Sequence, residues 1–136
     1  MTEIELQQQV ADYLRLQYPR VIFHSDFGSG IKLTMGQAVR QMKLNGGRRA
    51  WPDMFIAEPN ICAKKTKYAG LFIELKRSGV RLVKQDGGWA SIHIKEQAAM
   101  LDELRSRGYA AEFAVGFDQA KEIIDSYLGG KYGRRV

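Results

Sequence analysis

The sequence predicts an α/β domain in which helices flank a small mixed β-sheet, in the order helix, strand, strand, strand, helix, strand, helix. Apolar residues recur at spacings of three and four over residues 3–17, 94–107 and 118–128, which is typical of amphipathic helices. Short runs rich in β-branched and aromatic residues lie between these segments and indicate strands. The chain has 136 residues, of which 45% are hydrophobic, so one domain with an apolar core is expected.

The N-terminal part of the chain is predicted to form a helix, a strand and a long loop. The helix spans residues 3–17, and Thr2 serves as its N-cap. The run 21–23 is the first predicted strand. Residues 25–47 contain five glycines and indicate a loop with one helical turn around residues 36–43. Loops longer than about 12–15 residues are usually functional or disordered, so this one is a candidate substrate-binding element.

The remaining elements follow from the same periodicities. Two apolar runs, over residues 54–57 and 71–76, flank a turn-rich segment and are predicted to pair as antiparallel strands. The elements expected after them are a helix over 94–107 that Gly108 ends, a strand over 110–115 and a helix over 118–128. The predicted domain spans residues 1–128, and residues 129–136 are expected to form a basic, flexible tail.

Positive charge is concentrated in the middle of the chain. The net charge is +6, and residues 21–50 and 51–90 carry +4 and +3 of it, while the two ends together are slightly negative. This excess favours an anionic partner, and nucleic acid is the leading candidate. Lysines 64, 65 and 67 either belong to a phosphate-binding surface or keep a loop soluble. The basic residues of this stretch include Arg40, Lys43, Arg48, Arg49, Lys64, Lys65, Lys67, Lys76, Arg77, Arg81 and Lys84.

Composition also excludes several classes of protein. The single cysteine, Cys62, excludes an intramolecular disulfide framework and a cysteine-rich zinc site, and it fits a reducing compartment. The acidic N-terminus lacks the pattern of a secretion signal, and no apolar run approaches the length of a membrane span. We therefore expect a cytoplasmic protein, from a bacterial cell or a phage-infected host cell, without a membrane partner.

The candidate chemistry lies at the ends of the two central predicted strands. Alternate side chains of a strand share a face, so Glu74 and Lys76 point the same way. If the two strands pair antiparallel, Asp53 lies close to Glu74. Two neighbouring carboxylates repel unless positive charge lies between them, and Mg²⁺ or Mn²⁺ would supply it. Lys76 would then orient or deprotonate a water molecule, or stabilise charge on a phosphate. The alternative is a pair of surface carboxylates with Lys76 in a weak ion pair.

These residues resemble a known family of nucleases. Pro52-Asp53 at the start of one strand and Glu74-Leu75-Lys76 at the end of the next resemble the motif of the PD-(D/E)XK superfamily. The likeness is greatest to its VRR-NUC (virus-type replication-repair nuclease) domain and covers about residues 3–115. The further matches are Glu3 on the first helix, Gly46-Gly47-Arg48-Arg49 before Pro52, Arg77 after Lys76, and Glu96-Gln97 on the helix that follows.

The resemblance implies a restriction-endonuclease-like core and assigns roles to these residues. Asp53 and Glu74 would bind Mg²⁺ or Mn²⁺, with the main-chain carbonyl of Leu75 as a further ligand, and Lys76 would be the catalytic lysine. Gln97 would be a further catalytic residue. Glu3 either approaches the metal or offsets the dipole of its helix. DNA contacts are expected from Lys43, Arg48, Arg49 and Arg77, although arginines at positions 48 and 49 also serve solubility.

The function expected from this combination is a metal-dependent DNA endonuclease that recognises structure rather than sequence. The family likeness implies a homodimer that cleaves branched or junction DNA, in the manner of a Holliday-junction resolvase, in DNA repair or recombination, including that of a phage. Alternatives are a non-catalytic basic DNA-binding module and a basic scaffold protein. His24 and His93 are interpreted as non-catalytic. Trp51 and Trp89 either stack on exposed bases or pack in the core or its rim.

Overall fold

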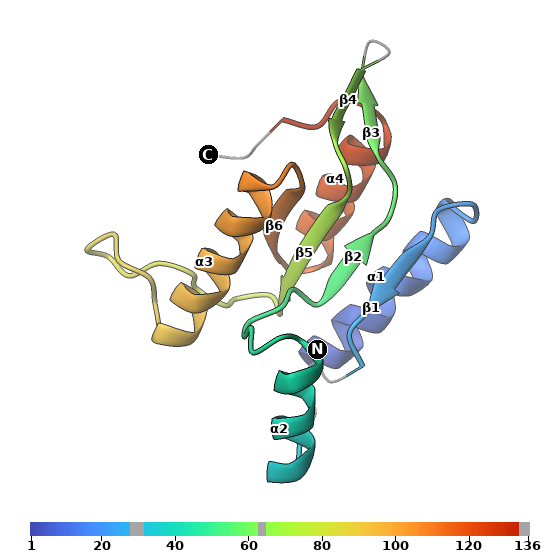
Figure 1. Ribbon diagram of the computed structural model, residues 1–136. Helices are drawn as coiled ribbons and strands as arrows, with labels where there is room; N and C mark the ends of the chain where they lie inside the picture. The colour runs from blue at the N-terminus through green and yellow to red at the C-terminus, as the bar shows by residue number, and fades with distance from the viewer. Residues whose placement is uncertain (28–31, 63–64, 134–136) are drawn as a thin grey trace.

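The computed structural model describes residues 1–27, 32–62 and 65–133. A four-stranded mixed sheet, in the order β1-β2-β5-β6, forms its centre, and β3 and β4 form a separate two-stranded sheet (Figure 1). Each helix within the described ranges is too short or too polar to span a lipid bilayer. The helices are α1 (Glu3–Gln17), α2 (Met35–Leu44), α3 (Ile92–Ser106) and α4 (Phe117–Leu128), and the strands are β1 (Phe23–Ser25), β2 (Met54–Ile56), β3 (Asn60–Cys62), β4 (Lys65–Tyr68), β5 (Leu71–Lys76) and β6 (Ala110–Val115).

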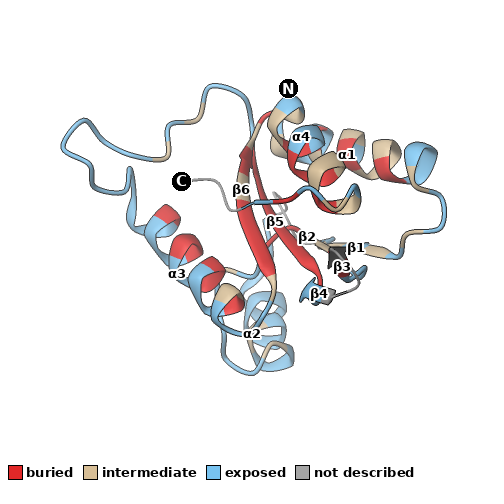
Figure 2. Ribbon diagram, turned by 90° about the horizontal axis from the view of Figure 1, so that it is seen from above, coloured by how far each residue is buried: buried red, intermediate tan, exposed pale blue. Residues whose placement is uncertain are grey.

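Helices cover both faces of the central sheet. Strand β2 runs antiparallel to β1 and β5, whereas β6 runs parallel to β5 because α3 connects them as a crossover. Helices α1 and α4 lie on one face and α3 on the other (Figure 2). All six residues of β5 are buried, as expected for a central strand between two layers. The face toward α1 and α4 holds Leu71, Ile73 and Leu75, and the face toward α3 holds Phe72 and Ala111, which form a cluster with Leu101 of α3.

Most predicted elements are confirmed, but the first strand is wrong by two residues. It was expected over residues 21–23 and lies at Phe23–Ser25. Its bounds follow from pairing with β2, since Phe23 opposes Ile56 and Ser25 opposes Met54. Ile22, counted as a strand residue from its β-branched side chain, is 71% exposed. Local β propensity therefore located the strand, and its partner set the register.

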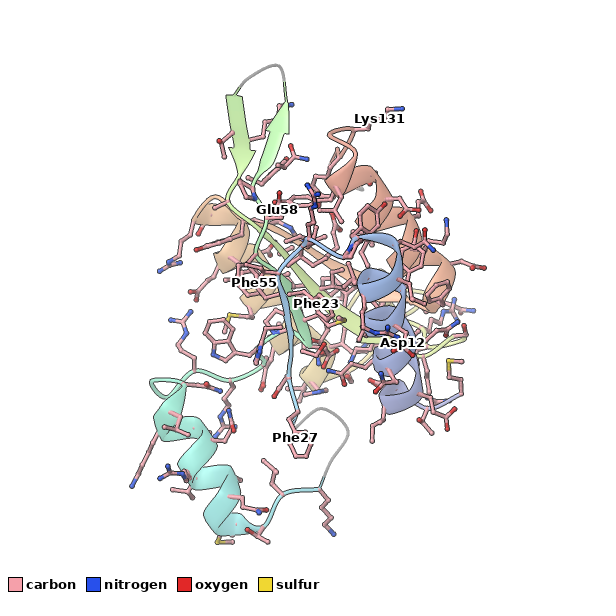
Figure 3. The ribbon with its side chains drawn as sticks, turned by 90° about the vertical axis from the view of Figure 1, so that its right-hand side faces the viewer. Asp12, Phe23, Phe27, Phe55, Glu58 and Lys131 are labelled. Atoms are coloured by element: carbon pink, nitrogen blue, oxygen red, sulfur yellow. The ribbon has the colours of Figure 1, made fainter. Side chains whose placement is uncertain are left out.

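The segment predicted over residues 25–47 as a loop with one helical turn around residues 36–43 holds more helix than expected, because Met35–Leu44 form the ten-residue helix α2. A capping box starts this helix: Gln37 N donates to Thr34 Oγ1 at 3.2 Å, and Thr34 N donates to Gln37 Oε1 at 3.0 Å. No residue of α2 is buried, and the helix stands apart from the layers (Figure 3). The glycines at positions 28 and 30, part of the evidence for a loop, lie outside the described residues.

The hairpin of β3 and β4 was not predicted, since residues 58–70 were taken as a turn-rich connection. Asn60, at its base, is 3% exposed and donates from Nδ2 to the carbonyl of Tyr127 in α4 at 2.7 Å. Pairing is irregular between Asn60 and Ile61, which obscures the alternation that marks a strand. Lys64, one of the expected basic residues, lies outside the described residues.

The C-terminal segment contributes to the core beyond Leu128. Tyr132, placed in the tail by the sequence, is 8% exposed, and its ring packs edge-on against Tyr68 and Tyr127. Its hydroxyl donates to Glu112, a buried carboxylate on β6. Residues 134–136 of the expected tail lie outside the described residues. A truncation after Leu128 would therefore remove part of the packed interior.

We expect Tyr132→Ala to lower the free energy of unfolding by about 3 kcal/mol, the usual range for removing a buried aromatic ring. The cost combines the cavity left beside Tyr127 with the loss of a donor to the buried Glu112 carboxylate. Urea unfolding of the two proteins measures it, and Lys131→Ala, at an exposed neighbouring position, is the control. Equal stability of Tyr132→Ala and the wild type would show that the core ends at Leu128.

Candidate active site

Strand pairing brings two acidic side chains together at the end of the sheet. The ladder between β2 and β5 begins where Met54 opposes Ile73, so Asp53 stands one position beyond it, beside Glu74. The backbone N–H of Asp53 donates to Glu74 Oε2 at 3.1 Å, and the N–H of Leu75 donates to Asp53 Oδ2 at 2.7 Å. Each carboxylate is thus held by the backbone of the neighbouring strand. Asp53 is 8% exposed and Glu74 is 4% exposed.

A lysine from the same face of β5 completes the charged group. Lys76 is buried, and its Nζ lies 3.9 Å from Glu74 Oε1. The two side chains are two residues apart on a strand and therefore point to the same side of the sheet, toward α3. One ammonium faces two carboxylates, which leaves the group with a net negative charge when all three are ionised. Such a group has spare oxygen atoms for a cation.

Helix α3 supplies a polar contact to this group. Gln97, also buried, donates from Nε2 to Glu74 Oε1. The same nitrogen lies 3.2 Å from Nε2 of His93, one helical turn earlier. The buried Gln97 Oε1 has no hydrogen-bond partner among the described residues. Gln97 thus links the carboxylate to an exposed histidine, which sequence reasoning had set aside as non-catalytic.

The pKa of Glu74 is raised from its ordinary value of 4.5 to about 9. Burial is the largest cause, the negative charge of Asp53 adds to it, and the positive charge of Lys76 opposes it. In the protein without a metal, Glu74 therefore retains its proton at neutral pH. Any cation that binds between the carboxylates competes with that proton.

These side chains open onto a cavity of about 720 Å³. One part of its wall comes from α2, which contributes Ala38, Gln41 and Met42. This helix, longer than the single turn expected there, thus forms a side of the site and makes few contacts with the other helices and strands. The lining includes Glu3, Asp26, Arg49, Trp51, Asp53, Glu74, Lys76, His93 and Gln97.

Glu3, the third acidic residue suggested by the resemblance, lines this cavity from the start of α1. In the part of the chain that the structure describes, no three His, Cys, Asp or Glu side chains gather closely enough to form a metal centre. A ligand role for Glu3 therefore stays a prediction. Its position in the first turn of α1 also suits compensation of the helix dipole.

The four residues expected to contact DNA are not equally placed. Arg49 lines the site cavity, and Lys43 is exposed in the last turn of α2. Arg48 pairs with the carboxylate of Glu103 on α3, so its guanidinium already has a partner. Lys67, counted with the basic middle of the chain, lies on β4, at the opposite end of β5 from Lys76 (Figure 1). The basic residues are therefore spread over more than one face.

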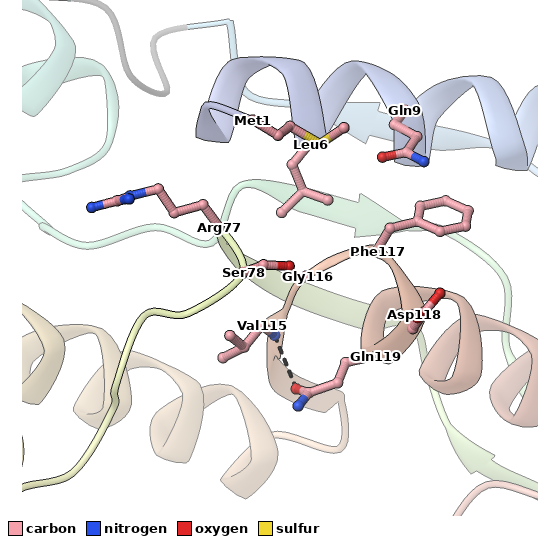
Figure 4. Close-up of a pocket in the computed structure, with 10 residues that line it drawn as sticks. All are labelled: Met1, Leu6, Gln9, Arg77, Ser78, Val115, Gly116, Phe117, Asp118 and Gln119. Carbon is pink, nitrogen blue, oxygen red and sulfur yellow. Dashed lines mark hydrogen bonds between the residues drawn. The ribbon is translucent and has the colours of Figure 1, made fainter.

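Arg77 lines a different cavity, of about 530 Å³, between α1 and the start of α4 (Figure 4). Its guanidinium points away from Gly116 in this view. Gly116 has a φ of 84°, and a Cβ there would lie 2.7 Å from Ser78 Oγ, so the close approach of these two loops requires glycine. The cavity has no Asp53, Glu74 or Lys76 in its wall and is separate from the carboxylate group.

Asp26 is a site residue that sequence reasoning missed. It follows β1, its backbone N–H donates to the carbonyl of Asp53 at 2.7 Å, and it lines the site cavity. Gln7 of α1 donates from Nε2 to the Asp26 carbonyl at 2.9 Å, which ties the helix to this segment. An acidic residue just after a strand was the available signal. It was not used because the strand was expected to end at Phe23 and its pairing with β2 was not foreseen.

A comparison with solved structures finds a VRR_NUC domain protein that is 23% identical in sequence and superimposes with a TM-score of 0.60. The match covers 95% of this chain and 89% of that chain. No protein-family model matches the sequence, and neither does any curated protein. At this identity the likeness establishes the fold. The expected restriction-endonuclease-like architecture, a small mixed sheet flanked by helices, is confirmed.

Proposed function

We propose that this chain, which has the fold of a VRR_NUC domain protein, is a divalent-metal-dependent nuclease that hydrolyses phosphodiester bonds in DNA. One observation carries the proposal: Asp53, Glu74 and Lys76 are buried side by side at one end of the sheet and line one cavity. Placing two carboxylates together out of water destabilises the fold, as the raised pKa of Glu74 indicates. Such unfavourable placements are typical of functional sites.

The donor set fits Mg²⁺ or Mn²⁺. Asp53 and Glu74 offer hard oxygen ligands in small number, which leaves room for water and phosphate, and the main-chain carbonyl of Leu75 is the expected further ligand. When bound, such an ion offsets phosphate charge and lowers the pKa of a water molecule. Lys76 would orient an attacking water molecule or stabilise the charge that develops on the phosphate. Gln97 holds the Glu74 carboxylate in position through its donated hydrogen bond.

Branched DNA is the proposed substrate. Arg49 places positive charge on the cavity wall, and α2 extends the site outward as a separate arm. Contacts of this kind read the backbone and shape of DNA rather than its bases. A two-fold homodimer would present two such sites to the symmetric arms of a four-way junction. Roles in DNA repair or recombination, a phage origin and a cytoplasmic location belong to the same proposal.

Cleavage of labelled DNA tests this function directly. A four-way junction and a linear duplex of the same length are incubated with the protein and Mg²⁺ or Mn²⁺. We expect the junction to be cut preferentially, and cleavage to be lost without a divalent ion and in Asp53→Ala. Asp86→Ala, at an exposed loop position, is the matched control and should cut normally. A wild-type protein that cuts neither DNA, or an Asp53→Ala protein that cuts both, would overturn the proposal.

Calorimetric titration of Mn²⁺ separates catalysis from simple DNA binding. We expect the wild type to bind the ion and Asp53→Ala to lose measurable binding, because one of two carboxylate ligands is gone. A non-catalytic DNA-binding module instead predicts no specific ion site, together with salt-sensitive DNA binding that survives loss of Asp53. Binding of Mn²⁺ to both proteins with equal affinity would contradict the assignment of Asp53 as a ligand.

A further inference from the structure

We infer that Trp51 stacks on an unpaired nucleobase beside the phosphate that is cut. The inference rests on the proposed nuclease function and assigns a residue that selects substrate. Trp51 is 40% exposed, unlike the buried charged residues that follow it. It precedes Asp53 by two residues, so their Cα atoms are at most about 7 Å apart. Both residues line the cavity of the carboxylates, so a base bound to Trp51 lies near the reacting phosphate.

Aromatic side chains support the Trp51 ring from within the protein. Its centroid lies 6.1 Å from that of Phe72, at a tilt of 49°. The Phe72 ring is itself stacked on Phe55 at 4.4 Å, and both contact the ring of Tyr109 edge-on. The indole is thus fixed by a packed cluster on one side and open on the other. A rigid, half-exposed ring stacks on a base with little loss of conformational entropy.

Trp51 also stands where three cavities meet. It lines the cavity of the carboxylates, a cavity of about 320 Å³ with His24 and Asn45, and a smaller one with Arg48 and Arg107. Arg48 and Arg107 both pair with Glu103, which also lines the smaller cavity, so their positive charge is partly offset. A DNA strand that reaches the carboxylates across this surface passes the Trp51 ring. Stacking does not depend on base identity, because every base has a π-face.

The backbone before Trp51 adopts an unusual conformation. Ala50 has a φ of 62°, in the left-handed region that residues other than glycine rarely occupy. Among the described residues it is the one non-glycine with a positive φ. Such conformations cost about 1–2 kcal/mol and occur where the surrounding structure enforces them, often at functional sites. Here the backbone conformation of Ala50 sets the orientation of the following residue, Trp51.

Bases in a regular duplex are stacked on their neighbours, so Trp51 needs a base that is unpaired or turned out of the helix. Branch points, bulges and single strands offer such bases. Trp51 therefore gives the site a preference for interrupted duplexes that requires no reading of sequence. Trp89, the other tryptophan, is 39% exposed but packs against Phe113 on β6, and it does not line the site cavity.

Fluorescence of Trp51 tests the stacking. In Trp89→Phe, Trp51 is the single tryptophan of the chain. This protein is titrated, with chelator and without divalent ion, with a fluorescein-labelled single-stranded oligonucleotide or with an oligonucleotide of the same length made of abasic sites. Anisotropy of the label measures binding, and indole emission measures stacking. We expect the oligonucleotide with bases to quench the emission and to bind about tenfold more tightly than the abasic one.

Two variants then separate stacking from charge. Trp51→Leu should bind both oligonucleotides with the weak affinity of the abasic one, whereas Trp51→Phe, which keeps an aromatic face, should retain the preference for bases. DNA that binds without quenching, or a Trp51→Leu protein that keeps the preference, would overturn the inference and leave the nuclease proposal standing. If neither oligonucleotide binds and no cleavage is seen with divalent ions, the proposed function and the inference both fail.

Discussion

Replacing Lys76 with methionine is expected to slow metal-dependent cleavage by about 10²–10³-fold, the usual effect of removing one group that stabilises transition-state charge. Methionine matches lysine in length and suits a site that is 6% exposed, so the fold should persist. The loss follows from removing the Lys76 ammonium, which lies 3.9 Å from Glu74 Oε1. Among the described residues, Lys76 is the one lysine that lines the cavity of the carboxylates. Single-turnover cleavage of the junction with excess protein and Mn²⁺ measures the chemical step.

The control is Lys131→Met, which removes the same charge from an exposed position in the C-terminal segment. It should cut at the wild-type rate. Mn²⁺ binding to Lys76→Met should persist, because both carboxylates remain, and this separates catalysis from ligand loss. A Lys76→Met protein that cuts as fast as the wild type would remove Lys76 from the mechanism and favour its role as a buried partner of Glu74.

Replacing Glu74 with glutamine is expected to stabilise the metal-free protein at alkaline pH while abolishing cleavage. In the wild type, the pKa of Glu74 is about 9 when folded and near 4.5 when unfolded. Between these values the folded state holds a proton that the unfolded state has released, so stability falls as pH rises, by at most about 1.4 kcal/mol per pH unit. The stabilising effect of the protonated carboxyl is complete below pH 4.5 and is lost by about pH 9.

Glutamine resembles the protonated carboxyl and does not titrate. The buried Gln97 Oε1, which has no partner among the described residues, is available to accept a hydrogen bond from the new amide. Urea unfolding of both proteins in chelator is measured at pH 5 and at pH 8. The unfolding free energy of the variant minus that of the wild type should be larger at pH 8 than at pH 5 by about 2 kcal/mol or more. Because Asp53 and Glu74 interact, this difference reports the titration of the carboxylate pair.

Added Mg²⁺ or Mn²⁺ provides the complementary measurement. The ion should stabilise the wild type at pH 8, since it binds the folded state, and should have little effect on Glu74→Gln. Identical pH dependence of the two proteins would mean that Glu74 is ionised in the folded state at neutral pH. A variant that keeps cleaving DNA would exclude Glu74 as a metal ligand.

Local patterns in the sequence determined most of the secondary structure and the chemistry of the candidate site. Apolar spacing located α1, α3 and α4, and apolar runs located β2, β5 and β6. Alternation along β5 placed Glu74 and Lys76 on one face, and antiparallel pairing placed Asp53 next to them. These inferences succeed because side-chain periodicity and strand pairing are local properties of the chain.

Features that depend on partners distant in sequence required the tertiary structure. The bounds of β1 follow from its register with β2. Tyr132 is buried because its hydroxyl donates to Glu112 and its ring packs against Tyr68. Asp26 and His93 reach the site through contacts with Asp53 and Gln97, which no spacing in the sequence encodes. Helix α2 has apolar residues at helical spacing, at Met35, Val39 and Met42, but the glycines on either side of it favoured a loop, and none of its residues is buried.

The sequence by itself thus determined which residue types carry the proposed chemistry and on which strands they lie, because a strand alternates its faces wherever it is placed. The tertiary structure decided which further residues share the cavity, how strongly Glu74 holds its proton, and that Trp51 stands half-exposed beside Asp53. Burial and electrostatic coupling are properties of the assembled layers. They arise only when segments remote in the chain exclude water from the same site.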